Sequence, residues 1–213
     1  MENRNNGLVQ MMLKFPSVVT VSLLWVVASI PVVTVGAANC GLYYAVNQAI
    51  VHDRDSVGRA FWRGFRRDFR QATPCWLVAL AFGLLFGVDY RLTGQWENSR
   101  AKTCLIGLFV ILMLVLCMMA LYLFPYIARF TNPTRQCLSN TVRLALWQFP
   151  KSVLLTAVFL LAAAVCIFFF PGFLLLPGVY GLLQNRLLEP VFQKIMSEED
   201  RALEEELNAE YDG

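Results

Sequence analysis

Charged side chains are missing from two long stretches of this chain of 213 residues. No Asp, Glu, Lys, Arg or His lies between Lys14 and His52, a run of 37 residues, or between Lys151 and Arg186, a run of 34. An α-helix rises ~1.5 Å per residue, so each run is ~50 Å long if helical, whereas the hydrocarbon core of a bilayer is ~30 Å thick. Each run is therefore too long for one upright membrane span.

Charge is also scarce in the chain as a whole. Only 15% of the residues are charged, 57% are hydrophobic, and the mean hydropathy is +0.53. A soluble domain of this size has too little interior to bury so much apolar surface. We therefore predict an all-α fold, a polytopic transmembrane helix bundle with five to six membrane segments, in which proline or glycine breaks the two long runs.

The motifs of several enzyme and transporter classes are absent as well. The chain contains no His-Glu-x-x-His, no Gly-x-Ser-x-Gly and no Walker sequence. No acidic, basic or histidine residue lies in the middle of a predicted span, where ion-coupled transporters usually keep one. The 6 cysteines form no Cys-x-x-Cys pair, which disfavours a zinc site or a disulfide framework. We expect no catalytic site, no metal and no cofactor.

Four predicted spans lie within residues 17–35, 72–88, 103–127 and 152–170. Segments 37–51 and 172–188 are the remaining parts of the long runs. Pro31 and Gly36 separate the first pair, and Pro171–Gly172, followed by Pro177–Gly178, separates the second. Because proline removes a backbone hydrogen bond and kinks a helix, we expect the chain to turn or bend at these places.

Basic residues select between the possible topologies, because Lys and Arg accumulate on the cytoplasmic side of a membrane. If both long runs form hairpins, 15 basic residues are cytoplasmic and 3 are external; if each run crosses once, the split is 10 against 8. The hairpin solution predicts six crossings with both termini in the cytoplasm. If segment 37–51 is instead a half-span or interfacial helix, five crossings remain and the N-terminus is external.

Net charge divides the chain into two parts. Residues 1–196 carry +10 and residues 197–213 carry −7. We therefore assign residues 1–196 to the helix bundle with its cytoplasmic amphipathic helices, and residues 197–213 to an acidic cytoplasmic tail.

An amphipathic helix is predicted in the basic loop before the second span. On a helical wheel with Phe61 at 0°, Phe65, Phe69 and Trp62 fall within 100°, and five arginines occupy the range from 140° to 240°. These arginines are Arg59, Arg63, Arg66, Arg67 and Arg70. Such a helix is expected to lie in the headgroup layer, aromatic face inward, with the arginines near anionic lipids or a protein partner. The segregation of aromatics from arginines argues against nucleic acid. A weaker apolar stripe, Leu138, Val142, Leu146 and Phe149, precedes the fourth span.

Small residues recur at every fourth position in two segments, a spacing that lets helices approach closely in lipid. They are Ala37, Gly41, Ala45 and Ala49 in the first segment, and Ala79, Gly83 and Gly87 in the second.

Amide and hydroxyl side chains at membrane depth form a candidate polar vestibule. The set comprises Thr34, Asn39, Asn47, Gln48, Gln184 and Asn185. Irregular backbone is tolerated at membrane depth only where it faces protein or a wet cavity. These residues therefore either satisfy the break in the helix or bind a ligand, and both alternatives stay open.

Several stretches together resemble the YesL family of bacterial membrane proteins. They are LW at 24–25, IPVVTVGA at 30–37, GLYY at 41–44, FWRGFRRDFRQA at 61–72, FPYIARF at 124–130 and QNRLL at 184–188. The resemblance covers about residues 10–195 and implies a small multi-span protein of the bacterial cell membrane. Members have no assigned activity and are commonly encoded beside carbohydrate ABC-transporter and glycosidase genes, and no catalytic residues are established for them.

The resemblance and the charge pattern together favour an accessory membrane protein of carbohydrate uptake. Its expected partners are a bilayer with anionic lipids and the subunits of a carbohydrate ABC transporter. The alternative is a stand-alone channel or permease for a small solute, formed by the two broken runs.

Overall fold

The computed structural model describes residues 2–94, 100–130, 132–168, 172, 174–196, 198 and 201, and the side chains of these from residue 14 on, except 92–101 and 167–168. Within these ranges the chain is all-α, as predicted, and contains no strand. The helices are α1 (Glu2–Ser29), η1 (Val32–Thr34), α2 (Val35–Ala45), η2 (Val46–Val51), α3 (Val57–Gly94), α4 (Arg100–Arg129), α5 (Thr134–Trp147), α6 (Phe149–Phe168) and α7 (Leu176–Ile195).

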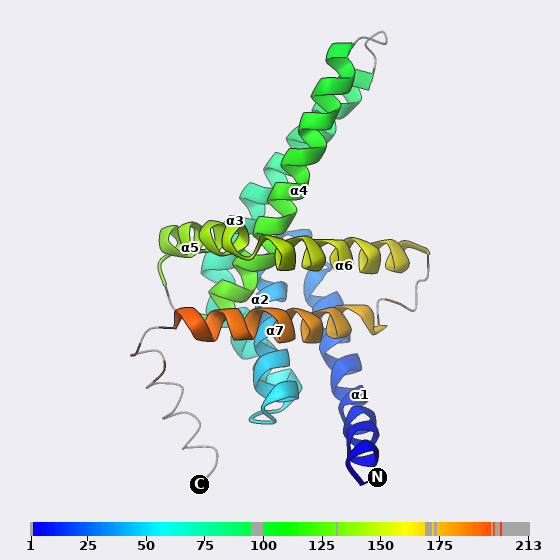
Figure 1. The fold of residues 1–213 in the computed structure, drawn as a ribbon, viewed down its shortest axis with the longest axis vertical. Coiled ribbons are helices and arrows are strands. Elements are labelled where there is room, and N and C mark those ends of the chain that lie inside the picture. Colours follow the sequence, from blue (N-terminus) through cyan, green and yellow to red (C-terminus); the bar gives the residue numbers. More distant parts are fainter. Residues whose placement is uncertain are drawn as a thin grey trace.

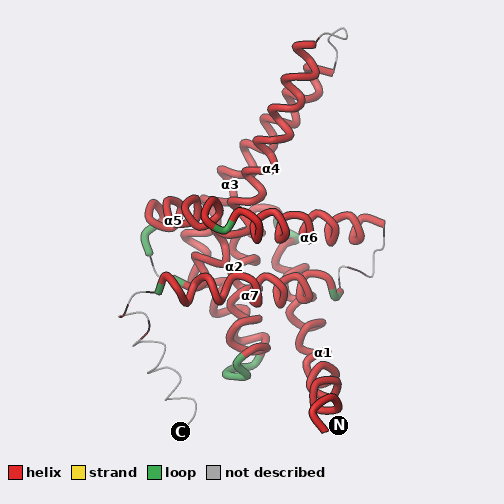
Figure 2. Tube along the Cα trace, in the orientation of Figure 1, coloured by secondary structure: helices red, strands yellow, loops and turns green. Residues whose placement is uncertain are grey.

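The helices form a central cluster from which one hairpin projects (Figure 1). α2 lies in the middle of the cluster and contacts α1, α3, α4 and α7. α3 and α4 continue out of the cluster as a long antiparallel pair, and α5, α6 and α7 run across the direction of this pair (Figures 1 and 2). Of the predicted acidic tail the structure describes only Glu198 and Arg201.

The first long run breaks at Pro31, as predicted, but not at Gly36, which lies inside α2 and packs closely against Trp76 of α3. α1 ends at Ser29, Pro31 is extended, and α2 begins at Val35 after one 3-10 turn. The Thr34 hydroxyl donates to the carbonyl oxygens of Ala28 at 2.6 Å and Pro31 at 2.7 Å. The first bond satisfies a backbone oxygen at the end of α1, and the Pro31 oxygen also accepts from the Thr34 amide at 2.9 Å.

The second long run breaks at only one of its two predicted places. α6 ends at Phe168 and α7 begins at Leu176, and Gly172 between them is not α-helical; Pro171 lies outside the described residues. Pro177 and Gly178 do not break the chain, because they lie in the first turn of α7, where proline removes no helical bond. The Gly178 amide donates to the Ser22 hydroxyl at 2.9 Å, so this turn packs directly on α1.

Three helices among the described residues are long and apolar enough to cross a membrane. They are Val57–Arg91 in α3, Lys102–Arg129 in α4 and Phe149–Cys166 in α6. Only 11%, 0% and 17% of their most apolar windows is buried. Because α6 runs across the α3–α4 hairpin in Figure 1, a bilayer crossed upright by the hairpin is not crossed upright by α6. The count of five to six segments and the side on which the C-terminus lies stay predictions.

The predicted interfacial helix is the first part of α3, which continues without interruption into the second predicted span. Phe61 is fully buried against α2 and Phe65 packs on the same core, while Trp62 and Phe69 are partly exposed. The expectation that the aromatic face inserts into the headgroup layer is therefore wrong for Phe61. A helical wheel identifies the apolar arc but not the surface that covers it.

Close helix contact is confirmed for the first small-residue segment but not for the second. Ala37 and Ala45 are fully buried, and a Cβ added to Gly41 would lie 3.0 Å from the Phe61 carbonyl oxygen. A Cβ at Gly83 would meet only a Met113 methyl group at 3.6 Å, and one at Gly87 would meet no described atom within 4 Å. The second segment therefore makes no close backbone contact with another helix at either glycine.

The apolar stripe predicted before the fourth span faces outward. On α5 the buried residues are Cys137, Thr141, Leu144 and Ala145. Leu138, Leu146 and Phe149 are exposed, and Val142 is partly buried. α5 therefore packs on the protein through a face other than most of the predicted stripe.

Candidate binding pocket

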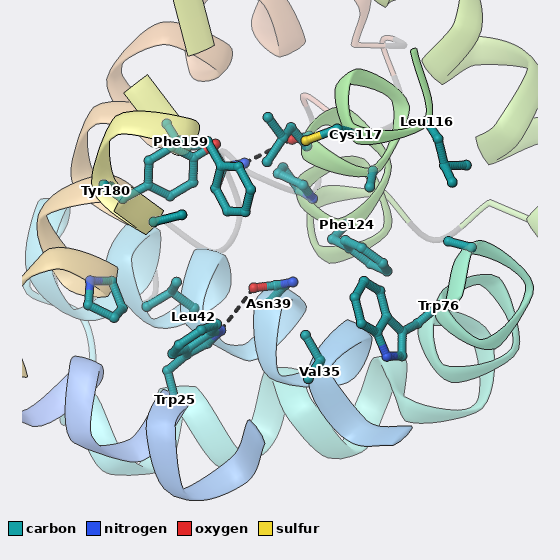
Figure 3. A pocket seen from close by; sticks show the side chains of 18 of the residues that line it. Trp25, Val35, Asn39, Leu42, Trp76, Leu116, Cys117, Phe124, Phe159 and Tyr180 are labelled. Carbon is teal, nitrogen blue, oxygen red and sulfur yellow. Dashed lines mark hydrogen bonds between the residues drawn. The ribbon is translucent and has the colours of Figure 1, made fainter. Parts of the chain in front are cut away.

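A cavity of about 600 Å³ lies between the central cluster and the base of the hairpin (Figure 3). This volume falls in the range of ~300–1,000 Å³ that is typical of ligand pockets. Its walls come from α1, α2, α3, α4, α6 and α7, so every candidate membrane helix contributes. Most of the lining is aliphatic or aromatic, including Trp25, Leu42, Trp76, Phe124 and Phe159.

Two amide side chains interrupt this apolar lining. The Asn39 carbonyl oxygen accepts a hydrogen bond from the Trp25 indole at 2.8 Å, as the dashed line in Figure 3 marks. The Gln184 amide nitrogen donates to the Leu121 carbonyl oxygen at 2.8 Å. Each amide thus uses one end on the protein, which fixes its orientation and leaves the Asn39 nitrogen and the Gln184 oxygen without a bond to a described residue.

A tyrosine lines the cavity with its ring. The ring of Tyr180 packs edge-on against Phe159 with a centroid distance of 5.5 Å. Its hydroxyl is buried in the protein, where it has no hydrogen-bond partner among the described residues. An unpartnered buried hydroxyl is costly, but this one is closed off from the cavity, so Tyr180 adds apolar surface to the wall.

A buried ion pair lies on the same helices. The Arg129 guanidinium contacts one Glu189 carboxylate oxygen at 3.0 Å, and the other oxygen accepts from the Tyr43 hydroxyl at 3.1 Å and the Asn47 amide at 3.2 Å. Only 13% of the Arg129 side chain and 12% of the Glu189 side chain are exposed. The cluster ties α2, η2, α4 and α7 together, and η2 is a π-helix, a form frequent at functional sites.

The Arg129–Glu189 pair was not predicted from the sequence, although the isolation of Glu189 among uncharged and basic residues indicates that its carboxylate has a special role. Between residues 90 and 196 the only acidic residues are Glu97 and Glu189. A lone carboxylate at the end of a long uncharged run requires a partner if it is buried. The sequence does not say which of many arginines supplies it.

The five arginines of α3 do not share one environment. Arg59 and Arg63 pair with Asp55, and Arg66 and Arg70 are exposed. Arg67 instead turns toward the protein, where it pairs with the buried Asp68 at 2.8 Å, donates to the Ala128 carbonyl and lies 4.8 Å from the centre of the Tyr44 ring. Arg67 therefore takes part in packing, although 37% of its side chain stays exposed, and the lipid or partner surface stays a prediction.

The six residues of the predicted vestibule are only partly brought together. Asn39 and Gln184 line the cavity. The Thr34 hydroxyl hydrogen-bonds to backbone carbonyl oxygens at the break after α1. The Asn47 amide donates to Glu189, and the Gln48 side chain hydrogen-bonds to Asn47 and Arg54. Asn185 is buried beside the ion pair on α7, and its amide nitrogen has no partner among the described residues. The vestibule stays a prediction for the two residues that line the cavity, where the surroundings are mainly apolar.

Comparison with known proteins adds one match. Residues 18–90 match the model of a family described as protein of unknown function, DUF624. The match covers about a third of the chain and runs from α1 to near the end of α3, so it includes Trp25, Asn39 and Trp76 of the cavity. No curated protein and no solved structure matches the chain.

Proposed function

We propose that this chain is a multi-pass protein of the bacterial cell membrane that acts as an accessory component of ABC-type carbohydrate uptake and has no catalytic activity of its own. The observation that carries the membrane assignment is the exposure of the apolar windows of α3, α4 and α6. Soluble monomers rarely expose contiguous apolar patches larger than a few hundred Å², and a bilayer is the environment in which such surfaces are stable.

The accessory role is supported by the resemblance to the YesL family, and the match at residues 18–90 to a family of unknown function is compatible with it. The exposed arginines of α3 supply a surface for anionic lipid or a cytoplasmic partner. Arg59, Arg63, Arg66 and Arg70 point away from the core, whereas the neighbouring Arg67 is committed to Asp68. Charge on such a rim steers association more than it stabilises the fold.

Purification in mild detergent from its own host tests this proposal. Permease or ATPase subunits of a carbohydrate transporter should co-purify with the chain, and the double variant Arg63→Glu/Arg66→Glu should recover them at least fivefold less. The matched control is Arg135→Glu/Arg143→Glu, which reverses two exposed arginines on α5. Repeated recovery of the chain alone, or equal loss in both double variants, contradicts the accessory role.

A stand-alone channel or permease is the second candidate, and the cavity between the helices is the observation in its favour. Its mainly apolar walls suit a hydrophilic solute poorly, because each buried sugar hydroxyl needs a hydrogen-bond partner. The test is the uptake of labelled sugars by liposomes that contain only this protein. Uptake above that of empty liposomes would favour the channel or permease over the accessory role.

A further inference from the structure

We propose that the cavity between the central cluster and the hairpin holds an acyl chain of a membrane phospholipid. The inference rests on the membrane location in the proposed function but not on carbohydrate uptake. The cavity has a volume of about 600 Å³. Protein interiors are close-packed, and a void of this size forfeits the contacts of all the side chains around it. Something therefore fills it in the native membrane.

The chemistry of the walls selects the occupant. Among the residues that the structure describes, no Asp, Glu, Lys, Arg or His lines the cavity, so these walls offer a charged ligand no counter-charge. A sugar is poorly matched, since most of its hydroxyls would find no partner. Water is equally disfavoured, because apolar cavities stay dry. A hydrocarbon chain needs no polar partner and gains from every apolar contact with side chains such as Leu42, Phe124 and Phe159.

The position of the cavity identifies the source of that chain. Part of its rim is formed by Gly83 and Met113 on the hairpin, and Met113 is exposed there. The neighbouring α3 and α4 surfaces are the exposed apolar windows expected in the hydrocarbon layer. The cavity is thus continuous with a surface that lipid already covers, and an acyl chain enters it without crossing water.

One polar group of the cavity fits the ester end of such a lipid. The Asn39 amide nitrogen points into the cavity in Figure 3, while the Asn39 oxygen is held by the Trp25 indole. An amide nitrogen is a hydrogen-bond donor. An ester carbonyl oxygen is an acceptor, so it would satisfy a group that the protein leaves unpaired.

Native mass spectrometry of the purified full chain, after exchange into detergent with palmitoyl-oleoyl-phosphatidylcholine, tests this inference. Ala163 lines the cavity from α6, and its neighbour Ala164 is exposed outside it. The wild-type chain should retain one phospholipid at collision energies that strip surface lipid. In Ala163→Phe, where the ring fills the cavity, the retained fraction should fall at least fivefold, and Ala164→Phe should behave as wild type. No retention by the wild type, or equal retention in the two variants, overturns the inference.

A second pair and a second measurement keep the test decisive if Ala163→Phe does not fold. Ala79→Phe fills the cavity from α3, and Ala81→Phe on the same helix is its exposed control. In the unaltered protein, phosphatidylcholine with a diazirine on its acyl chain should crosslink to the wall residues Leu121, which is buried, and Phe159, which is partly buried. Adducts confined to exposed residues contradict the site. These readouts use purified protein, so they are independent of transporter recovery, and fractionation of cells reports membrane location separately.

Discussion

Replacement of Glu189 by alanine probes the ion pair that ties α7 to α2 and α4. Alanine removes the carboxylate that pairs with the Arg129 guanidinium and that accepts from the Tyr43 hydroxyl and the Asn47 amide. Loss of one member of a buried pair costs about 3–5 kcal/mol, since the remaining charge is left without compensation. With 13% of Arg129 and 12% of Glu189 exposed, water reaches the pair, and we expect the lower end of that range.

A loss of about 3 kcal/mol corresponds to a ~150-fold change in the unfolding equilibrium constant, because about 1.4 kcal/mol is a factor of ten. For a chain of this size the midpoint of thermal unfolding should fall by about 6–12 °C. Tryptophan fluorescence of the detergent-solubilised protein during heating measures this shift. Glu189→Gln keeps an acceptor for Tyr43 but removes the charge, so its midpoint should lie between those of wild type and Glu189→Ala.

The matched control is Asp53→Asn. Asp53 also forms an ion pair, with Lys14 at 3.4 Å, but 73% of its side chain is exposed, and such pairs contribute about 0–1 kcal/mol. Asparagine also tolerates the positive φ of 52° at this position. The double variant Arg129→Met/Glu189→Met should recover most of the loss of either single replacement, because apolar side chains of similar size need no partner. A Glu189→Ala shift no larger than that of Asp53→Asn would refute the reasoning.

Two further replacements test the packing of α3 and α5. A Cβ at Gly64 would lie 2.7 Å from the Tyr44 Cβ, so Gly64→Ala should destabilise the protein by about 1–3 kcal/mol in the same thermal assay. The control is Gly58→Ala on the same helix, where a Cβ meets nothing within 4 Å and should stabilise the protein by up to about 1 kcal/mol. Equal effects of the two variants would contradict the α2–α3 contact. Burial raises the pKa of the Cys137 thiol, so less of the reactive thiolate is present at any given pH. N-ethylmaleimide at pH 7.5 should therefore modify Cys137 at least tenfold more slowly than the exposed cysteine of Ser139→Cys two positions along α5, measured by peptide mass spectrometry, and equal rates would place α5 off the core.

Local features of the sequence predicted the elements that local chemistry determines. Pro31 ends α1 because a proline nitrogen cannot donate in any neighbourhood. The small residues from Ala37 to Ala49 predicted close contact because small side chains at every fourth position admit another helix whatever its identity. The second uncharged run contains most of a helix of membrane length, α6, whereas the first holds only the shorter apolar helix Lys14–Ser29.

What long-range packing determines was not available from the sequence. The helical wheel and the structure both place Phe61 on the apolar arc of its helix. Only the structure shows that α2, and not lipid, covers this side chain. Arg129 and Glu189 are 60 residues apart, and the sequence offers many equivalent arginines for one carboxylate.

The sequence by itself therefore determined the all-α class, the apolar helices and the break after α1, because composition, proline and residue spacing act within a turn or two of helix. The tertiary structure alone decided which arginine meets Glu189, which aromatic face is buried and where a cavity opens between α1, α2, α3, α4, α6 and α7. These depend on which surfaces meet, and a helix carries the shape of its own face but not the identity of its neighbour.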